Sequence, residues 1–193
     1  LLLLAVLVLI LLNAFFVAAE FALIASRKTQ VEHLAAEGNA QARVALGLMR
    51  QLSLQLAGAQ LGITMASLGL GAIAEPAVAH GIEAGLEGIV EIPSGLLHTI
   101  SFVLGLSIVV FLHMVIGEMA PKNIVIAEPD RSALVLAIPF RIYATIFKPF
   151  IVFLNWLANL FVRLFGVEPV DELQSAHTSG EIGFMITESA KKG

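Results

Sequence analysis

The feature that most constrains this chain is a carboxylate inside a long apolar run. The run begins near Leu97 and carries Glu118, followed by Pro121 and Lys122. Hydrocarbon cannot solvate a carboxylate, so such a residue usually marks a functional site. Pro121 lacks an N–H and frees carbonyls about one turn back, where Gly117 lies. These oxygens suit magnesium or sodium; the alternative is a proline-kinked helix with a protonated or paired Glu118.

Composition places the chain in a membrane. Of its 193 residues 58% are hydrophobic and 13% are charged, whereas a soluble domain carries about 25% charged residues. Cysteine is absent, which excludes disulfides and thiolate metal sites. No basic patch suits nucleic acid. We therefore predict an all-α integral membrane domain that binds the lipid bilayer.

Three stretches are long and apolar enough to cross roughly 30 Å of hydrocarbon. They cover about residues 1–25, 52–75 and 97–126. In the first, Asn13 and Glu20 lie two helical turns apart and share one face. Asn13 suits either an interhelical hydrogen bond or a ligand role, and Glu20 suits a functional role or pairing with a cation or a lysine.

The second span is rich in small and hydroxyl residues. Gln60, Thr64 and Ser67 recur at helical spacing and predict an oxygen-bearing stripe facing Glu118. The alternative is tight packing, with hydroxyls bonded to the carbonyl four residues earlier. A glycine pair four residues apart, Gly58 and Gly62, predicts close helix contact. With the many alanines, it leads us to expect a homodimer packed through the small-residue face of the second or third helix.

Charge in the connecting segments predicts the orientation. Residues 26–50 are basic and belong in the cytoplasm, whereas residues 75–98 carry acids and no Lys or Arg and belong outside. The N-terminus is then outside and the C-terminus cytoplasmic. Residues 133–167 combine basic residues, aromatics and prolines, which favours an interfacial hairpin divided at Pro149 over a fourth span. The polar residues 168–193 are predicted to be a linker.

Other motifs narrow the function. His113 lies five residues before Glu118, off its immediate face, and is predicted to pack or to hydrogen-bond rather than to bind a metal ion. The chain contains no HExxH, GxSxG, Walker A or Rossmann motif. We therefore predict that this domain is not an enzyme.

Three segments, in this order and spacing, resemble a known family. They read LLNAFFVAAEFALIASR, LAGAQLGITMASLGLGAIAEP and VIGEMAPKNIVIAEPDR. Together they are similar to the transmembrane domain, called DUF21, of CorC proteins, the bacterial relatives of the CNNM magnesium transporters. The tail TSGEIGFMITESAKKG resembles the helix that leads to the family's cytoplasmic CBS-domain pair.

The resemblance implies a magnesium exporter of the bacterial inner membrane. Its expected form is a homodimer of three-span protomers with a cytoplasmic juxtamembrane helical belt, exporting Mg²⁺ with Na⁺ coupling. ATP would bind only to the absent CBS domains. The carboxylate of the family's GExxPK element is Glu118 here, the expected anionic ligand.

The chain departs from the family at four positions. Many relatives carry Ser or Asn where this chain has Val17, Ala19, Ala59 and Ile63. The neutral ligands are then expected among carbonyls, such as that of Gly117, and among polar side chains. The expected set of metal ligands is Glu118, Ser67, Thr64, Gln60, Asn13, Glu20 and Gly117. A membrane-anchored Mg²⁺ sensor and a membrane-active interaction protein are the alternative functions.

Overall fold

A computed structural model describes residues 2–86 and 94–166 as helices and short connections. No strand occurs in these two ranges, which confirms the prediction of an all-α fold. The helices are α1 (Leu2–Ala25), α2 (Lys28–Ala36), α3 (Ala40–Met49), α4 (Leu52–Leu86), α5 (Ser94–Leu112), a π-helix η1 (His113–Met119), α6 (Ala120–Ala127), α7 (Pro129–Ile146) and α8 (Lys148–Leu164).

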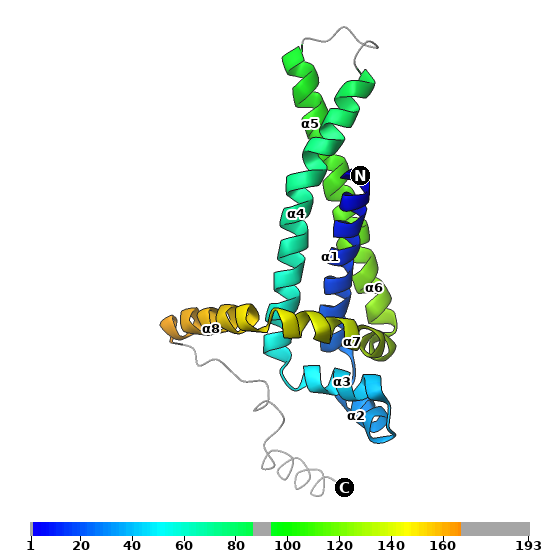
Figure 1. The fold of residues 1–193 in the computed structure, drawn as a ribbon, viewed down its shortest axis with the longest axis vertical. Helices are drawn as coiled ribbons and strands as arrows, with labels where there is room; N and C mark the ends of the chain where they lie inside the picture. The colour runs from blue at the N-terminus through cyan, green and yellow to red at the C-terminus, as the bar shows by residue number, and fades with distance from the viewer. Residues whose placement is uncertain (1, 87–93, 167–193) are drawn as a thin grey trace, which may run out of the picture.

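Three long helical rods stand side by side in Figure 1. They are α1, α4 and the continuous rod formed by α5, η1 and α6. Each contains a stretch long and apolar enough to cross a membrane, and the stretches are Leu4–Ala25, Leu52–Ala74 and Gly95–Ala127. The chain is therefore a membrane protein with three candidate spans among its described residues, close to the predicted ranges.

Much of the predicted acidic connection, residues 75–98, is helical rather than a loop. The helix α4 continues to Leu86, and α5 already begins at Ser94. Alanine and glutamate are good helix formers, so the segment after the second span extends the helix instead of forming a loop. Residues 87–93 and the side chains of Glu75 and Glu83 lie outside the described part. Residues 167–193, which include the predicted linker 168–193, also lie outside it.

The main hydrophobic core lies where α1 meets the helices at one end of the bundle. Phe16, Ala19 and Leu23 of α1 pack there with buried residues of α2, α3, α4 and α7. The ring of Phe16 fits against the backbone of Gly62, where an added Cβ would come within 2.6 Å of three ring carbons. Glycine at position 62 therefore allows α1 and α4 to approach closely.

Replacing Gly62 by alanine should destabilise the bundle. Because the aromatic ring of Phe16 is itself packed against Tyr143, with centroids 4.5 Å apart, it has little room to yield. Overpacking of this kind costs about 1–3 kcal/mol. Gly71→Ala is the matched control, because nothing lies within 4 Å of its added Cβ. Thermal denaturation in detergent should show a loss for Gly62→Ala alone, and equal melting temperatures would contradict this packing.

The glycine pair does not leave a free surface for a second copy. Gly58 lies against the side chain of Ile151, whose Cδ1 would be 3.0 Å from an added Cβ, and its carbonyl accepts a hydrogen bond from the Tyr143 hydroxyl at 3.1 Å. Both Gly58 and Gly62 are thus covered within one chain. The homodimer packed through the small-residue face of the second or third helix stays a prediction.

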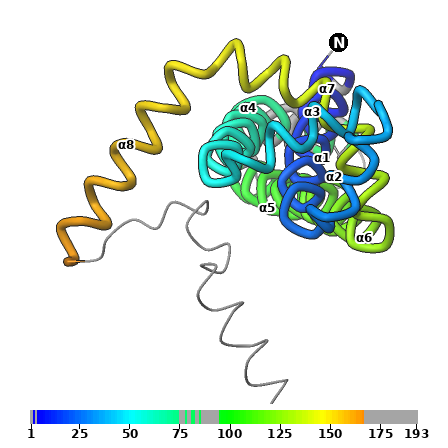
Figure 2. The backbone as a smooth tube through the Cα atoms, turned by 90° about the horizontal axis from the view of Figure 1, so that it is seen from below, coloured from blue at the N-terminus to red at the C-terminus, as the bar shows by residue number. Residues whose placement is uncertain are grey.

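A belt of helices crosses one end of the bundle. Figure 1 shows α7 and α8 lying across the rods, with α2 and α3 at the same end. The two belt helices meet at 81° at Phe147, so they form an L rather than the predicted hairpin. Pro149 does not divide the segment, because a proline in the first turn of α8 lacks only an N–H that has no intrahelical partner. Figure 2 shows α8 extending away from the bundle.

A hydrogen-bonded ion pair joins the belt to the end of the first span. Asp130, in the first turn of α7, accepts hydrogen bonds from the backbone N–H of Arg27 at 2.8 Å and from its guanidinium at 2.7 and 3.1 Å. Burial acts to raise the pKa of Asp130, but the hydrogen bonds and the charge of Arg27 outweigh it, so the pKa is lowered. The ion pair with Arg27 therefore favours the ionised carboxylate of Asp130.

The contribution of the Arg27–Asp130 ion pair to stability should depend on pH. A carboxyl group whose pKa is lowered on folding stabilises the fold above its unfolded value, about 3.9, and loses that effect as the pH falls through the folded value. At pH 7 Asp130→Asn should cost about 1 kcal/mol or less, because water screens an exposed pair. The melting temperatures of both proteins should converge as the pH falls through the lowered pKa of folded Asp130, and a constant difference would contradict the ionic account.

Candidate cation site

The third rod changes its helical pitch where the family motif lies. Residues His113–Met119 form a π-helix, in which the N–H of Ala120 bonds to the carbonyl of Val115, five residues earlier. Pro121 has no N–H to offer the carbonyl of Gly117, four residues earlier. Single π-helical turns occur frequently at functional sites. The local sequence therefore both unwinds the rod and leaves the Gly117 carbonyl without an α-helical donor.

The freed carbonyl is bonded by a side chain from the first span. The Asn13 side-chain nitrogen donates to the Gly117 oxygen at 3.0 Å, and Asn13 is fully buried. The Ser67 hydroxyl of α4 donates to the other end of that amide, its Oδ1, at 3.1 Å. Because a carbonyl can only accept, the amide orientation follows from the chemistry of its neighbours. All three rods thus contribute to one polar network.

His113 extends the network to the carboxylate. Its Nε2 lies 3.2 Å from the Ser67 hydroxyl and 3.8 Å from Oε1 of Glu118. Since the single Ser67 proton goes to Asn13, Nε2 must carry a hydrogen and donate to the serine. Its side chain is 19% exposed and that of Glu118 is 46% exposed. One imidazole N–H therefore faces both Ser67 and Glu118.

The sequence interpretation placed His113 away from Glu118, and this is wrong. In an α-helix residues five apart lie on different faces, but a π-helix repeats its hydrogen bonds every five residues and brings them together. The hydrogen-bonding role predicted for His113 is correct. Gly117 is close-packed in the same turn, since an added Cβ would lie 3.1 Å from the His113 ring and 3.2 Å from the Asn13 nitrogen.

Three of the predicted ligands lie outside this network. The Thr64 hydroxyl donates to the carbonyl of Gln60 at 2.8 Å, the packing alternative for such hydroxyls, and both residues are exposed. Glu20 is half-buried on α1 and takes no part in the hydrogen bonds that link Asn13, Ser67, Gly117 and His113. The structure therefore brings together Asn13, Ser67, Gly117 and Glu118, and adds His113.

The positions of departure from the family are apolar packing positions. Val17, Ala19 and Ala59 are buried, and Ile63 packs against the same core. Asn13 precedes Val17 by four residues and Ser67 follows Ile63 by four, while α1 and α4 run in opposite directions (Figure 1). Asn13 and Ser67 thus each lie one helical turn, about 6 Å along the axis, from a position of departure. Both are displaced towards the same end of the bundle.

The network offers oxygen atoms with one negative charge. Asn13, Ser67 and Gly117 supply neutral oxygens, and Glu118 supplies a carboxylate. Among the described side chains no group of three or more His, Asp or Glu residues is placed to hold a metal ion. A cation bound here would rely on hard oxygen ligands completed by water, which is the chemistry that Mg²⁺ prefers. It does not resemble a zinc site built from histidines.

Comparisons with known proteins agree with the motifs. A family model described as the cyclin M (CNNM) transmembrane N-terminal domain matches residues 3–193. The uncharacterized protein Rv1841c of Mycobacterium tuberculosis is 46% identical over 94% of this chain and 51% of its own length. The UPF0053 proteins YhdP and YhdT of Bacillus subtilis are 39% and 37% identical, each over 96% of this chain and 42% and 40% of their own lengths.

These matches cover almost all of the chain but only part of each relative. The chain spans about half the length of the curated relatives it matches, or somewhat less. What the similarity establishes is therefore the family of this membrane domain. The chain belongs to the CNNM transmembrane-domain family.

Proposed function

We propose that this domain transports Mg²⁺ out of the cell, with Na⁺ as the coupling ion. Its cation site is the network of Asn13, Ser67, Gly117 and Glu118, with His113 beside the carboxylate. The N-terminus lies outside and the belt lies in the cytoplasmic interface. The functional unit is a homodimer, and ATP acts only through cytoplasmic CBS domains of a longer protein. Family membership supports a role in divalent-cation transport or its regulation.

One observation carries the proposal. The fully buried Asn13 bonds the carbonyl that Pro121 leaves free, and the same network reaches Glu118 through Ser67 and His113. Polar groups inside an apolar bundle are costly and are retained where an ion or a proton passes. A purely structural kink would need the proline but not a carboxylate.

The composition of the site suits release as well as capture. Mg²⁺ gives up its hydration water reluctantly, so a site must supply charge and oxygens to replace it. A single carboxylate with neutral oxygens compensates this loss in part. Tight storage sites use several carboxylates. Moving two positive charges against a membrane potential requires work of about 2.3 kcal/mol per charge per 100 mV, which an inward Na⁺ gradient can supply.

Flux measurement tests this function. The protein is reconstituted into liposomes, and Mg²⁺ movement is followed with a fluorescent indicator, with and without an opposing Na⁺ gradient. A transporter should move Mg²⁺, and the rate should rise with the Na⁺ gradient. If Mg²⁺ binds with no net flux under either condition, the transport proposal is wrong and the domain is a cation sensor.

A further inference from the structure

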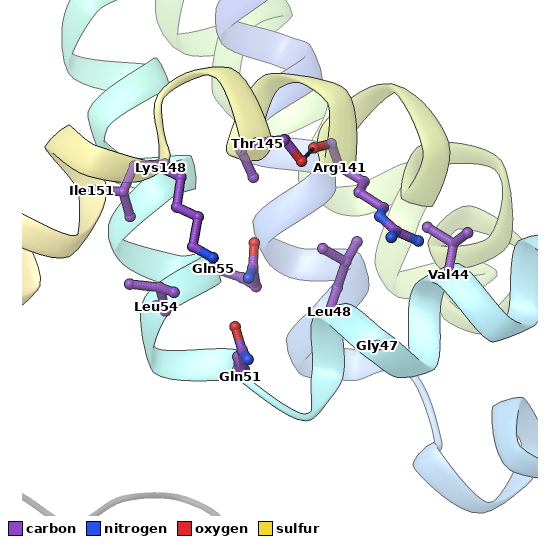
Figure 3. Close-up of a pocket in the computed structure, with 11 residues that line it drawn as sticks. Val44, Gly47, Leu48, Gln51, Leu54, Gln55, Arg141, Thr145, Lys148 and Ile151 are labelled. Carbon is purple, nitrogen blue, oxygen red and sulfur yellow. Dashed lines mark hydrogen bonds between the residues drawn. The ribbon is translucent and has the colours of Figure 1, made fainter.

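A second polar pocket lies in the belt, away from the cation network. It is an open pocket lined by α3, the start of α4, α7 and the start of α8, and it has a volume of about 270 Å³. That is room for roughly nine water molecules at about 30 Å³ each. Figure 3 shows the side chains around it. Its polar lining consists of Gln51, Gln55, Arg141, Thr145 and Lys148.

Two cations line this pocket without a counter-charge. Arg141 and Lys148 are the charged residues of the lining, and no aspartate or glutamate is among the lining residues. Neither cation forms an ion pair with any side chain in the described part of the chain. In Figure 3 Lys148 extends towards Gln55, whereas Arg141 lies on the opposite side, beside Val44. The pocket is thus positively charged on two sides.

The glutamines add unused hydrogen-bond donors. Gln55 is only 8% exposed, and its amide makes no hydrogen bond to the described residues. Gln51 lies one turn earlier and also points into the pocket. The amide atoms of Gln55 are not among the fully buried polar atoms that lack a partner, so they are accessible from the pocket. Two amides, an ammonium and a guanidinium form a set of donors that matches the oxygens of a phosphate group.

We propose that this pocket binds a phosphate group, held by Lys148 and Arg141 with the amides of Gln51 and Gln55. The surroundings favour a phospholipid headgroup as its source. The pocket lies at the end of the apolar rods, and α8, which starts at its edge, exposes large apolar side chains along its length, namely Phe150, Val152, Phe153, Trp156, Leu160 and Phe161. A headgroup in the pocket would leave the acyl chains beside that apolar surface.

The test measures lipid retention by the full chain with native mass spectrometry. Phosphatidylglycerol and diacylglycerol are the two probes, because they share acyl chains and differ by the phosphoglycerol group. Phosphatidylglycerol should be retained and diacylglycerol should not. The double variant Arg141→Gln/Lys148→Gln should lower phosphatidylglycerol affinity at least about tenfold, since charge-assisted hydrogen bonds are the strong ones. Both residues are exposed, so the fold should survive.

Matched variants separate this site from general charge attraction. Arg163→Gln removes a cation near the end of α8, outside the pocket, and should leave the affinity within about twofold, less than 0.5 kcal/mol. Lys148→Arg keeps the charge and should retain most of the binding. Equal losses from Arg163→Gln and from the double variant would overturn the proposal, as would equal retention of the two lipids.

Inorganic phosphate distinguishes the two sources of the ligand. It is added at millimolar concentration to the lipid-bound protein and, separately, to lipid-free protein followed by calorimetry. Lipid retention that resists phosphate supports a headgroup site, and phosphate binding that the double variant abolishes supports a site for free phosphate. If neither probe binds the parent protein, the pocket is not a phosphate site.

Discussion

A Glu118→Gln protein should bind Mg²⁺ at least about tenfold more weakly and should export none. Glutamine keeps the size and polarity of the side chain but removes the negative charge that offsets dehydration of the ion. The loss of a charge-assisted contact costs about 1.5–3 kcal/mol, and about 1.4 kcal/mol is a factor of ten in affinity. The remaining oxygens of the network are neutral, so no other group in it can replace that charge.

Liposome flux measures the transport effect, and Thr64→Ala is its control. Thr64 lies on α4 like Ser67, but its hydroxyl is bonded to its own helix and is exposed. Its loss should leave Mg²⁺ export near the parent rate. Ser67→Ala should have an intermediate effect, because water can replace a neutral hydroxyl as a ligand. If Glu118→Gln exports Mg²⁺ at the parent rate, the carboxylate of Glu118 has no role in transport.

Replacing Asn13 by leucine should damage both the fold and the site. Leucine fills a similar volume but can neither donate to the Gly117 carbonyl nor accept from Ser67. A buried polar group left without its partner costs about 1–3 kcal/mol. We therefore expect a lower melting temperature in detergent and a loss of Mg²⁺ affinity of about tenfold or more, since about 1.4 kcal/mol of lost coordination suffices.

Gln60→Leu is the matched control for this change. It also removes a side-chain amide from a membrane rod, but Gln60 is exposed and its side chain takes no part in the network. Its melting temperature and Mg²⁺ affinity should match those of the parent. If Asn13→Leu lowers stability while leaving Mg²⁺ affinity intact, Asn13 is a structural residue and the ion binds elsewhere.

Much of this site could be predicted from the sequence because its chemistry is local. Pro121 determines that a carbonyl one turn earlier lacks its donor, and that carbonyl belongs to Gly117. A carboxylate in an apolar run identifies Glu118 without knowledge of the fold. The three apolar stretches were predictable for the same reason, since span length and composition follow from the thickness of the bilayer.

What the sequence could not reveal depends on pitch and on long-range contacts. The pairing of His113 with Glu118 requires a π-helix, and spacing rules based on the α-helix place the two apart. The stripe of Gln60, Thr64 and Ser67 was predicted as a unit, yet only Ser67 faces Asn13. A helical period of 3.6 residues gives a broad face, and neighbouring helices decide which residues of it are buried.

The belt shows a similar limit. Prolines, basic residues and aromatic residues indicated that residues 133–167 differ from the spans. The position and size of the bend, 81° at Phe147, could not be predicted from them. The angle depends on packing against α4, where Ile151 fits on Gly58. That contact joins residues more than ninety positions apart, which no local pattern encodes.

The most direct test of the cation site compares two carboxylates by Mg²⁺ calorimetry. Glu118→Gln and Glu20→Gln each remove one negative charge from a membrane rod, but only Glu118 belongs to the network, whereas Glu20 lies near Lys122. The affinity should fall at least about tenfold for Glu118→Gln and stay near the parent value for Glu20→Gln. Parent affinity in Glu118→Gln together with lost affinity in Glu20→Gln would contradict this account and place the ion at Glu20.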